Sequence, residues 1–180
     1  MLQIVIPSVE LWDEKRERFI STKEQTLSLE HSLVSISKWE SKWCKPFLSN
    51  NTKTREEMID YIRCMTLTQN VDPNVYSLIT IDNMQQVDEY ISLPMTATTI
   101  NSDKNAPMSR ETITSELIYY WMIAQNIPFE CQKWHLNRLL MLIKVCSIKN
   151  KPPKKRSKNQ ILSQNAALNA ARRKKLNSKG

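Results

Sequence analysis

Glycine is almost absent from this sequence. A chain of 180 residues would hold roughly a dozen glycines at the usual frequency of about 7%, but this chain has one, Gly180. Phosphate-cradling loops, dinucleotide-binding turns and nucleophile elbows need glycine for close backbone approach or a positive φ angle. The scarcity excludes these motifs from the body of the chain and leaves its turns to Pro, Asn, Asp and Ser.

Long apolar runs are also missing. The longest, LIYYWMIA at 117–124, falls far short of the ~20 residues that span a bilayer, and the N-terminal LQIVI is too short for a signal peptide. We therefore predict no membrane segment and a cytosolic protein. The four cysteines follow no CxxC spacing, which favours reduced thiols over disulfides or a zinc site; they are Cys44, Cys64, Cys131 and Cys146.

Acidic side chains are absent from one end of the chain. Residues 149–180 contain eleven Lys or Arg and no Asp or Glu, so the other residues hold 15 basic and 18 acidic side chains, a balance of 15 − 18 = −3. The formal net charge of +8 therefore describes an extension attached to a mildly acidic body. Any contact with a polyanion is expected in that extension.

Extended structure is predicted for the first thirty residues. LQIVI precedes Pro7, and VELW, RFIST and QTLSLE follow, the last with apolar and polar residues alternating at period two. This pattern predicts a small antiparallel sheet.

Helical spacing begins after that sheet. Leu33, Ile36 and Trp43 recur at helical intervals up to Pro46, and Thr54 with Glu57 forms a capping box for the next helix. Asp72 before Pro73 predicts a further helical turn. Asp82 is predicted to cap another helix that ends at Pro94, before a long loop over 94–108.

Two longer helices are predicted after the loop. The first is capped by Ser109 and buries a face that contains Ile113, Leu117 and Tyr120. The second runs from Glu130 past Trp134 with a broad apolar face, and the short connection at Pro128 predicts an antiparallel hairpin.

The predicted fold class is mainly α, with a small N-terminal antiparallel β element and a basic, flexible C-terminal extension. The β element covers 1–32, the helical body 33–150, and the tail 151–180. Two prolines and clustered like charge oppose compact structure at the start of the tail, whereas its alanines favour a helix that is transient or forms on binding.

Few residues are spaced as a catalytic or metal site would require. Cys131 and His135 are predicted at i and i+4 of one helix, but the chain has only two histidines and a closed zinc site needs four ligands. Glu56, Glu57 and Asp60 share a helix start, where the helix dipole attracts acids. We predict no catalytic residue, no metal and no cofactor, and hence no enzyme.

Tryptophan supplies the candidate contact surface. Trp39 and Trp43 stand four residues apart in SISKWESKWCKPF, each preceded by a lysine. They either pack the first helix onto the body or anchor a partner, since tryptophan is both highly buried and enriched at interface hot spots. The full set of candidate partner-binding residues is Trp39, Trp43, Phe47, Trp121 and Trp134.

The basic tail either solubilises the chain or binds an anionic partner. Without aromatic residues it is suited to backbone phosphates and not to base stacking. The candidate polyanion-binding residues are Lys154, Lys155, Arg156, Lys158, Arg172, Arg173, Lys174 and Lys175.

Several strings together resemble a known family. They are LSLEHSLVSISKWESKWCKPFL, PMTATTI, ELIYYWMIAQNIPFECQKWHLNRLLMLIKVC, KNKPPKK and NAALNAARRKKLNSKG. Their combination is similar to small proteins encoded among the tail genes of long-tailed bacteriophages, in particular tail assembly chaperones, and the similarity spans nearly the whole chain.

The resemblance implies a mostly helical, non-enzymatic protein in the cytoplasm of the bacterial host. Such a chaperone binds the hydrophobic tape measure protein until tail tube protein polymerises around it, and family members are often made in shorter and longer frameshifted forms. A second hypothesis is a virion structural or nucleic-acid-binding protein that acts through the basic tail. A third is a host-directed adaptor. The sequence leaves the oligomeric state open.

Overall fold

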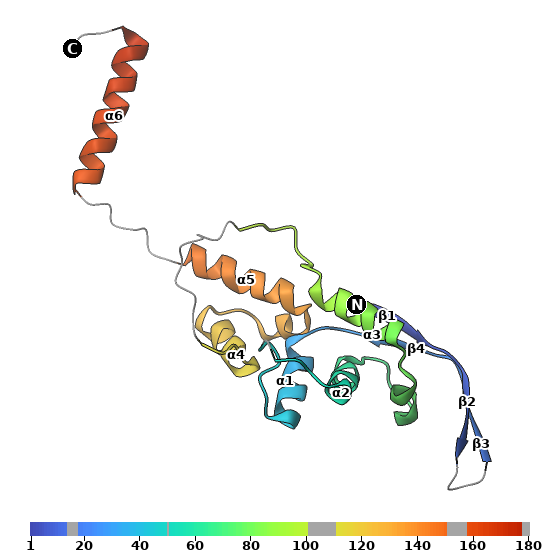
Figure 1. Ribbon diagram of the computed structural model, residues 1–180. Helices are drawn as coiled ribbons and strands as arrows, with labels where there is room; N and C mark the ends of the chain where they lie inside the picture. Colours follow the sequence, from blue (N-terminus) through green and yellow to red (C-terminus); the bar gives the residue numbers. More distant parts are fainter. Residues whose placement is uncertain (14–17, 50, 101–110, 151–157, 178–180) are drawn as a thin grey trace. The chain divides into compact units, whose positions relative to one another are not determined.

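The computed structural model describes residues 1–13, 18–49, 51–100, 111–150 and 158–177. Helices make up most of the described chain, and two antiparallel strand pairs lie near the N-terminus (Figure 1). The predicted mainly α class with a small β element is therefore confirmed. Among the described residues, no helix is both long enough and apolar enough to cross a membrane.

The chain divides into two compact units, Met1–Ser147 and Ile148–Gly180. The division falls close to the predicted end of the body at residue 150. The second unit contains one long helix, α6 (Lys158–Leu176), whose described side chains are exposed along its length.

The strands of the first unit are antiparallel, as predicted, and form two separate pairs. β1 (Leu2–Ile6) pairs antiparallel with β4 (Gln25–Leu29), and β2 (Val9–Asp13) pairs with β3 (Arg18–Thr22). Apolar residues at alternate positions of β1 and β4 are buried, as the pleat requires; they are Ile4, Ile6, Leu27 and Leu29. This face of the β1–β4 pair forms part of the core.

The first two helices begin where local capping chemistry favours it. α1 (Leu33–Trp43) is capped by Ser32, and α2 (Arg55–Met65) begins with the predicted capping box of Thr54 and Glu57. α1 packs against α2 and α4. Cys44 ends α1 at a φ of 52°, a left-handed position that glycine would usually occupy.

The next helical segments follow Asp72 and Thr80. Asp72 caps the 3-10 helix η1 (Pro73–Leu78), as predicted. The predicted cap of α3 (Ile81–Ser92) at Asp82 is wrong, because the Thr80 hydroxyl accepts the Asn83 backbone N–H at 3.1 Å and the Asn83 side chain pairs back with Thr80. Asp82 then lies in the first turn, where the helix dipole favours an acid.

The position and inner face of α4 (Ser115–Ala124) also differ from the prediction. Thr114 caps this helix, residues 111–113 are not helical, and Ser109 lies outside the described residues. Ile118 and Met122 are the apolar side chains that it buries, whereas Tyr120 is exposed. Because this helix is apolar on all sides, its sequence has no helical repeat of apolar and polar residues that would predict which side is buried.

The last predicted helix of the body is split in two. A 3-10 helix, η2 (Phe129–Lys133), is followed by α5 (Leu136–Lys149), and Trp134 and His135 separate them. The predicted hairpin with α5 is not the main packing of α4, which packs mainly against α1. The break allows the Leu136 N–H to donate to the His31 carbonyl at 2.7 Å, which attaches α5 to the start of α1.

Candidate docking surfaces

Trp39 and Phe47 belong to the core of the body. Trp39 is 1% exposed, and its indole N–H donates to the Glu57 carbonyl at 2.9 Å. Its ring contacts Phe47 edge to face at a centroid distance of 5.2 Å, and Phe47 is itself buried. Trp39 therefore follows the packing alternative, and the prediction of Trp39 and Phe47 as partner-binding residues is corrected because both side chains are buried.

Trp43 remains a candidate contact residue. It is half-buried and stacks on Trp39, while its indole N–H donates to Asp60 at 2.9 Å. The Lys42 ammonium binds the other oxygen of that carboxylate. Burial alone would raise the pKa of Asp60, but the hydrogen bonds from Lys42 and Trp43 outweigh it and hold that pKa below its ordinary value.

A shallow groove of about 430 Å³ extends from Trp43 toward η1. Its walls come from α1, α2 and η1, and Ile59, Pro73 and Tyr76 supply apolar surface. The Arg63 guanidinium lies 4.9 Å from the Tyr76 ring centroid. The groove thus combines aromatic faces with cations.

A second apolar surface, the α4–η2 face, consists of Tyr119, Tyr120, Ile123 and Phe129. Tyr120 and Ile123 lie three residues apart on the solvent side of α4, with exposures of 63% and 60%. Tyr119 lies one turn from Ile123, and its ring is 6.4 Å from that of Phe129, which is 52% exposed. The Tyr119 hydroxyl and Gln132 share a 2.9 Å hydrogen bond that joins α4 to η2.

The two other predicted tryptophans lie near this region of the chain. Trp121 and Trp134 are both half-buried and pack against the core. The Arg138 guanidinium covers the Trp134 ring at 4.2 Å from its centroid. Each leaves only part of its ring for a partner. More exposed are Tyr120, Ile123 and Phe129, which the tryptophan-based prediction missed.

The predicted pairing of Cys131 and His135 on one helix is wrong. Cys131 belongs to η2, whereas His135 precedes α5, and both are buried. Across the described ranges, no cluster of three His, Cys, Asp or Glu side chains is arranged to hold a metal ion. The four cysteines are free thiols.

The two histidines meet in the core. Their ring centroids are 5.0 Å apart, with Nδ1 of His31 at 2.5 Å from the Tyr61 hydroxyl and Nε2 of His135 at 3.1 Å from the Tyr90 carbonyl. Burial lowers the pKa of His31 to about 3, and the neighbouring His135 adds to that effect. Burial also lowers the pKa of His135. Both rings are therefore neutral at pH 7 and act as packing and hydrogen-bonding groups.

The predicted polyanion-binding residues fall partly on α6. Exposed basic side chains occur at its start, Lys158, and in its last turns, at Arg172, Arg173, Lys174 and Lys175. Lys154, Lys155 and Arg156 lie outside the described residues. No acidic residue occurs anywhere in the α6 sequence, so this helix carries only positive side-chain charge.

Comparison with family models, with curated proteins and with solved structures finds no match to this chain.

Proposed function

We propose that this protein is a non-enzymatic tail assembly chaperone of a long-tailed bacteriophage, which binds the hydrophobic tape measure protein in the cytoplasm of the bacterial host. The observation that supports the proposal is the α4–η2 face, because three of its four side chains, Tyr120, Ile123 and Phe129, have half or more of their surface in water, and such exposed apolar clusters are characteristic of binding sites. The family resemblance suggests which client covers it.

The α4–η2 face has the properties of a preformed contact surface. Ile118 and Met122 fix the opposite side of α4 in the core, so the exposed side chains stand on a rigid support. Tyrosine and phenylalanine offer large contact areas at low cost in conformational entropy. An apolar stripe on a tape measure helix could pack across this face and be shielded from water until tail tube protein replaces it.

Removing the apolar side chains of this face tests the proposal. Tyr120→Ser combined with Ile123→Ser is expected to weaken binding of a co-expressed tape measure protein by at least about tenfold, as loss of interface hot spots does. The amount of tape measure protein that co-purifies, followed by titration calorimetry, measures the effect. Stability should change little, since both side chains are already exposed.

The matched control replaces exposed apolar side chains elsewhere on the body. Ile81 is 81% exposed and Leu67 is 56% exposed, so Ile81→Ser with Leu67→Ser removes comparable apolar surface away from the α4–η2 face. This control should bind as the natural chain does. Equal binding by both double variants would reject the α4–η2 face, and no binding by the natural chain would reject the proposed client.

A nucleic-acid-binding role through the tail is a second candidate, and the exposed cationic α6 favours it. Replacing Arg172, Arg173, Lys174 and Lys175 with Gln is expected to flatten the dependence of DNA affinity on salt. The slope of log K against log salt should fall by about 3 to 4 for four lost phosphate contacts. Fluorescence anisotropy between 50 and 200 mM salt, about the range over which such contacts are lost, would measure it. An unchanged slope would exclude these four residues of α6 as the contact.

A further inference from the structure

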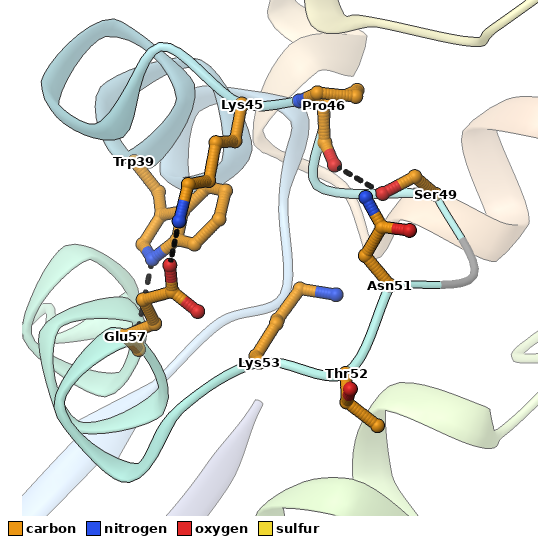
Figure 2. Close-up of a pocket in the computed structure, with 8 residues that line it drawn as sticks. All are labelled: Trp39, Lys45, Pro46, Ser49, Asn51, Thr52, Lys53 and Glu57. Carbon is orange, nitrogen blue, oxygen red and sulfur yellow. Dashed lines mark hydrogen bonds and ion pairs between the residues drawn. The ribbon is translucent and has the colours of Figure 1, made fainter.

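A small cavity lies beneath the loop that joins α1 to α2. Its volume is about 100 Å³, and Trp39 and Glu57 form its inner wall. The loop contributes Lys45, Asn51 and Lys53, with Pro46, Ser49 and Thr52 also lining the cavity (Figure 2). Neither of the docking surfaces described above uses this cavity.

The single carboxylate of the cavity is already neutralised. The Lys45 ammonium donates to Glu57 Oε1 at 2.6 Å, and the Thr54 backbone N–H donates to Oε2 at 2.8 Å. The hydrogen bond from Lys45, followed by that from Thr54, holds the pKa of Glu57 below its ordinary value. Glu57 is therefore ionised at pH 7, and Lys45 balances its charge.

Lys53 supplies a second cation that lacks such a partner. Its ammonium lies 4.4 Å from the centroid of the Phe47 ring, and within the described parts of the chain no carboxylate forms an ion pair with it. Burial lowers the pKa of Lys53, while the more distant Glu57 and Asp88 oppose that shift. Counting Lys45, Lys53 and Glu57, the lining carries one net positive charge.

Neutral donors lie beside this cation. In the described ranges, no hydrogen bond engages the side-chain amide of Asn51 or the hydroxyl of Thr52. Ser49 differs, because its hydroxyl already donates to the Pro46 carbonyl at 2.9 Å. Figure 2 shows Lys53 and Asn51 extending from the same side of the loop toward the cavity. The Lys53 ammonium and the Asn51 amide therefore have hydrogen-bond donors available on this side of the loop, whereas the Thr52 side chain points away from it.

We infer that the cavity between the α1–α2 loop and Glu57 binds one small oxyanion, a phosphate or sulfate group. Its charge is complemented by Lys53, and its oxygens accept from the Lys53 ammonium and the Asn51 amide. A volume of about 100 Å³ leaves room for one such group. The bound anion would also supply the opposite charge that the half-buried Lys53 lacks.

Titration of the full chain with inorganic phosphate, at constant ionic strength maintained with sodium chloride, tests this site. Two-dimensional amide NMR separates it from the basic tail, because binding in the cavity should move the backbone resonances of Asn51, Thr52 and Lys53 and the indole N–H of Trp39. These shifts are expected to saturate along one binding curve. Shifts confined to the tail, or shifts that never saturate, would overturn the inference.

Matched lysine variants establish which cation is responsible. Lys53→Met should weaken phosphate binding by about tenfold or more, since a charge-assisted hydrogen bond is worth at least that factor. Lys38→Met removes the same charge from an exposed position on α1 outside the cavity and should change the affinity less than about twofold. Equal affinities in the two variants would overturn the site.

A loop variant and a second ligand test the site further. If Lys53→Met lowers the melting temperature, Asn51→Ala removes a donor from an exposed loop residue and should still weaken binding about threefold. No effect of either variant would reject the site. Titration with phosphoserine distinguishes the sources. Shifts equal to those with phosphate show that the site also accepts a phosphoryl group carried by a partner, and shifts with phosphate alone restrict the site to the free ion.

Discussion

Replacing Trp39 with alanine is expected to lower the free energy of unfolding by about 3 to 5 kcal/mol, the usual cost of truncating a buried tryptophan. The indole is 1% exposed, stacks on Trp43 and meets Phe47 edge to face. Truncation would also leave the Glu57 carbonyl without its 2.9 Å partner. Since a domain is stable by only about 5 to 15 kcal/mol, this loss is a large fraction of the total.

Urea denaturation of the natural chain and of two variants measures the effect. Trp43→Ala is the matched control, because Trp43 is the same residue type, one turn later on α1, and only half-buried. It should cost roughly 1 to 2 kcal/mol, since less apolar area is lost and water can hydrate Asp60 after truncation. Equal costs for the two variants would contradict the assignment of Trp39 to the core and of Trp43 to its edge.

Local capping chemistry explains which helix starts could be read from the sequence. Thr54 and Glu57 form a reciprocal pair that depends only on neighbouring residues, and the predicted start of α2 is confirmed. At α3 two caps compete, and Thr80 prevails over Asp82 because Asn83 completes a capping box with Thr80. That pairing uses Asn in place of the usual Glu or Gln, so the sequence pattern predicts this capping box less strongly.

Tertiary contacts decided what the sequence left open. LIYYWMIA is apolar on every side of α4, so only packing on α1 selects Ile118 and Met122 as the buried side chains. The exposed α4–η2 face follows from that choice. The split between η2 and α5 also depends on a distant partner, because the Leu136 N–H pairs with the His31 carbonyl.

The cavity beneath the α1–α2 loop had no sequence signature. Lys45 and Lys53 lie eight positions apart in a stretch without helical or strand periodicity, and each alone resembles a solvated lysine. Phe47 brings them together by inserting into the core, where the Glu40 carboxylate accepts its backbone N–H at 2.7 Å. The Glu40 carboxylate also accepts the Ser115 N–H, a contact across 75 residues that no local pattern indicates.

Acid sensitivity is the second large effect expected of this protein, and it originates in the histidine pair. His31 is enclosed by Tyr61, Phe47 and His135, and Tyr90 contacts the His135 ring edge to face at 5.0 Å. Glu30 is an anion that acts on His135, and it binds the Tyr90 hydroxyl and the N-terminal ammonium. Glu30 favours protonation of His135, but burial outweighs it and the pKa of His135 stays lowered.

A histidine whose folded pKa lies below its unfolded value stabilises the fold fully above about pH 6.5 and loses that contribution as the pH falls. With a folded pKa of about 3, His31 makes the free energy of unfolding drop by about 1.4 kcal/mol per pH unit between pH 6.5 and 3. The loss should reach roughly 3 kcal/mol by pH 4.5. The carboxylates of Glu57 and Asp60 have lowered pKa values, so their contributions begin to be lost only near their ordinary pKa values of 4.5 and 3.8, at the acid end of this window. Burial raises the pKa of Asp88, so this carboxyl opposes the loss of stability there.

Urea midpoints measured at pH 7.5, 5.5 and 4.5 would test this slope against a His31→Leu variant. Leucine cannot be protonated, so the variant should be less stable at pH 7.5, where it lacks the Tyr61 hydrogen bond, but should lose much less stability on acidification. The two stability curves should therefore converge as the pH falls toward 4.5. Parallel curves would show that His31 is not the group that protonates on unfolding, and a natural chain equally stable at pH 7.5 and 4.5 would contradict the buried neutral pair itself.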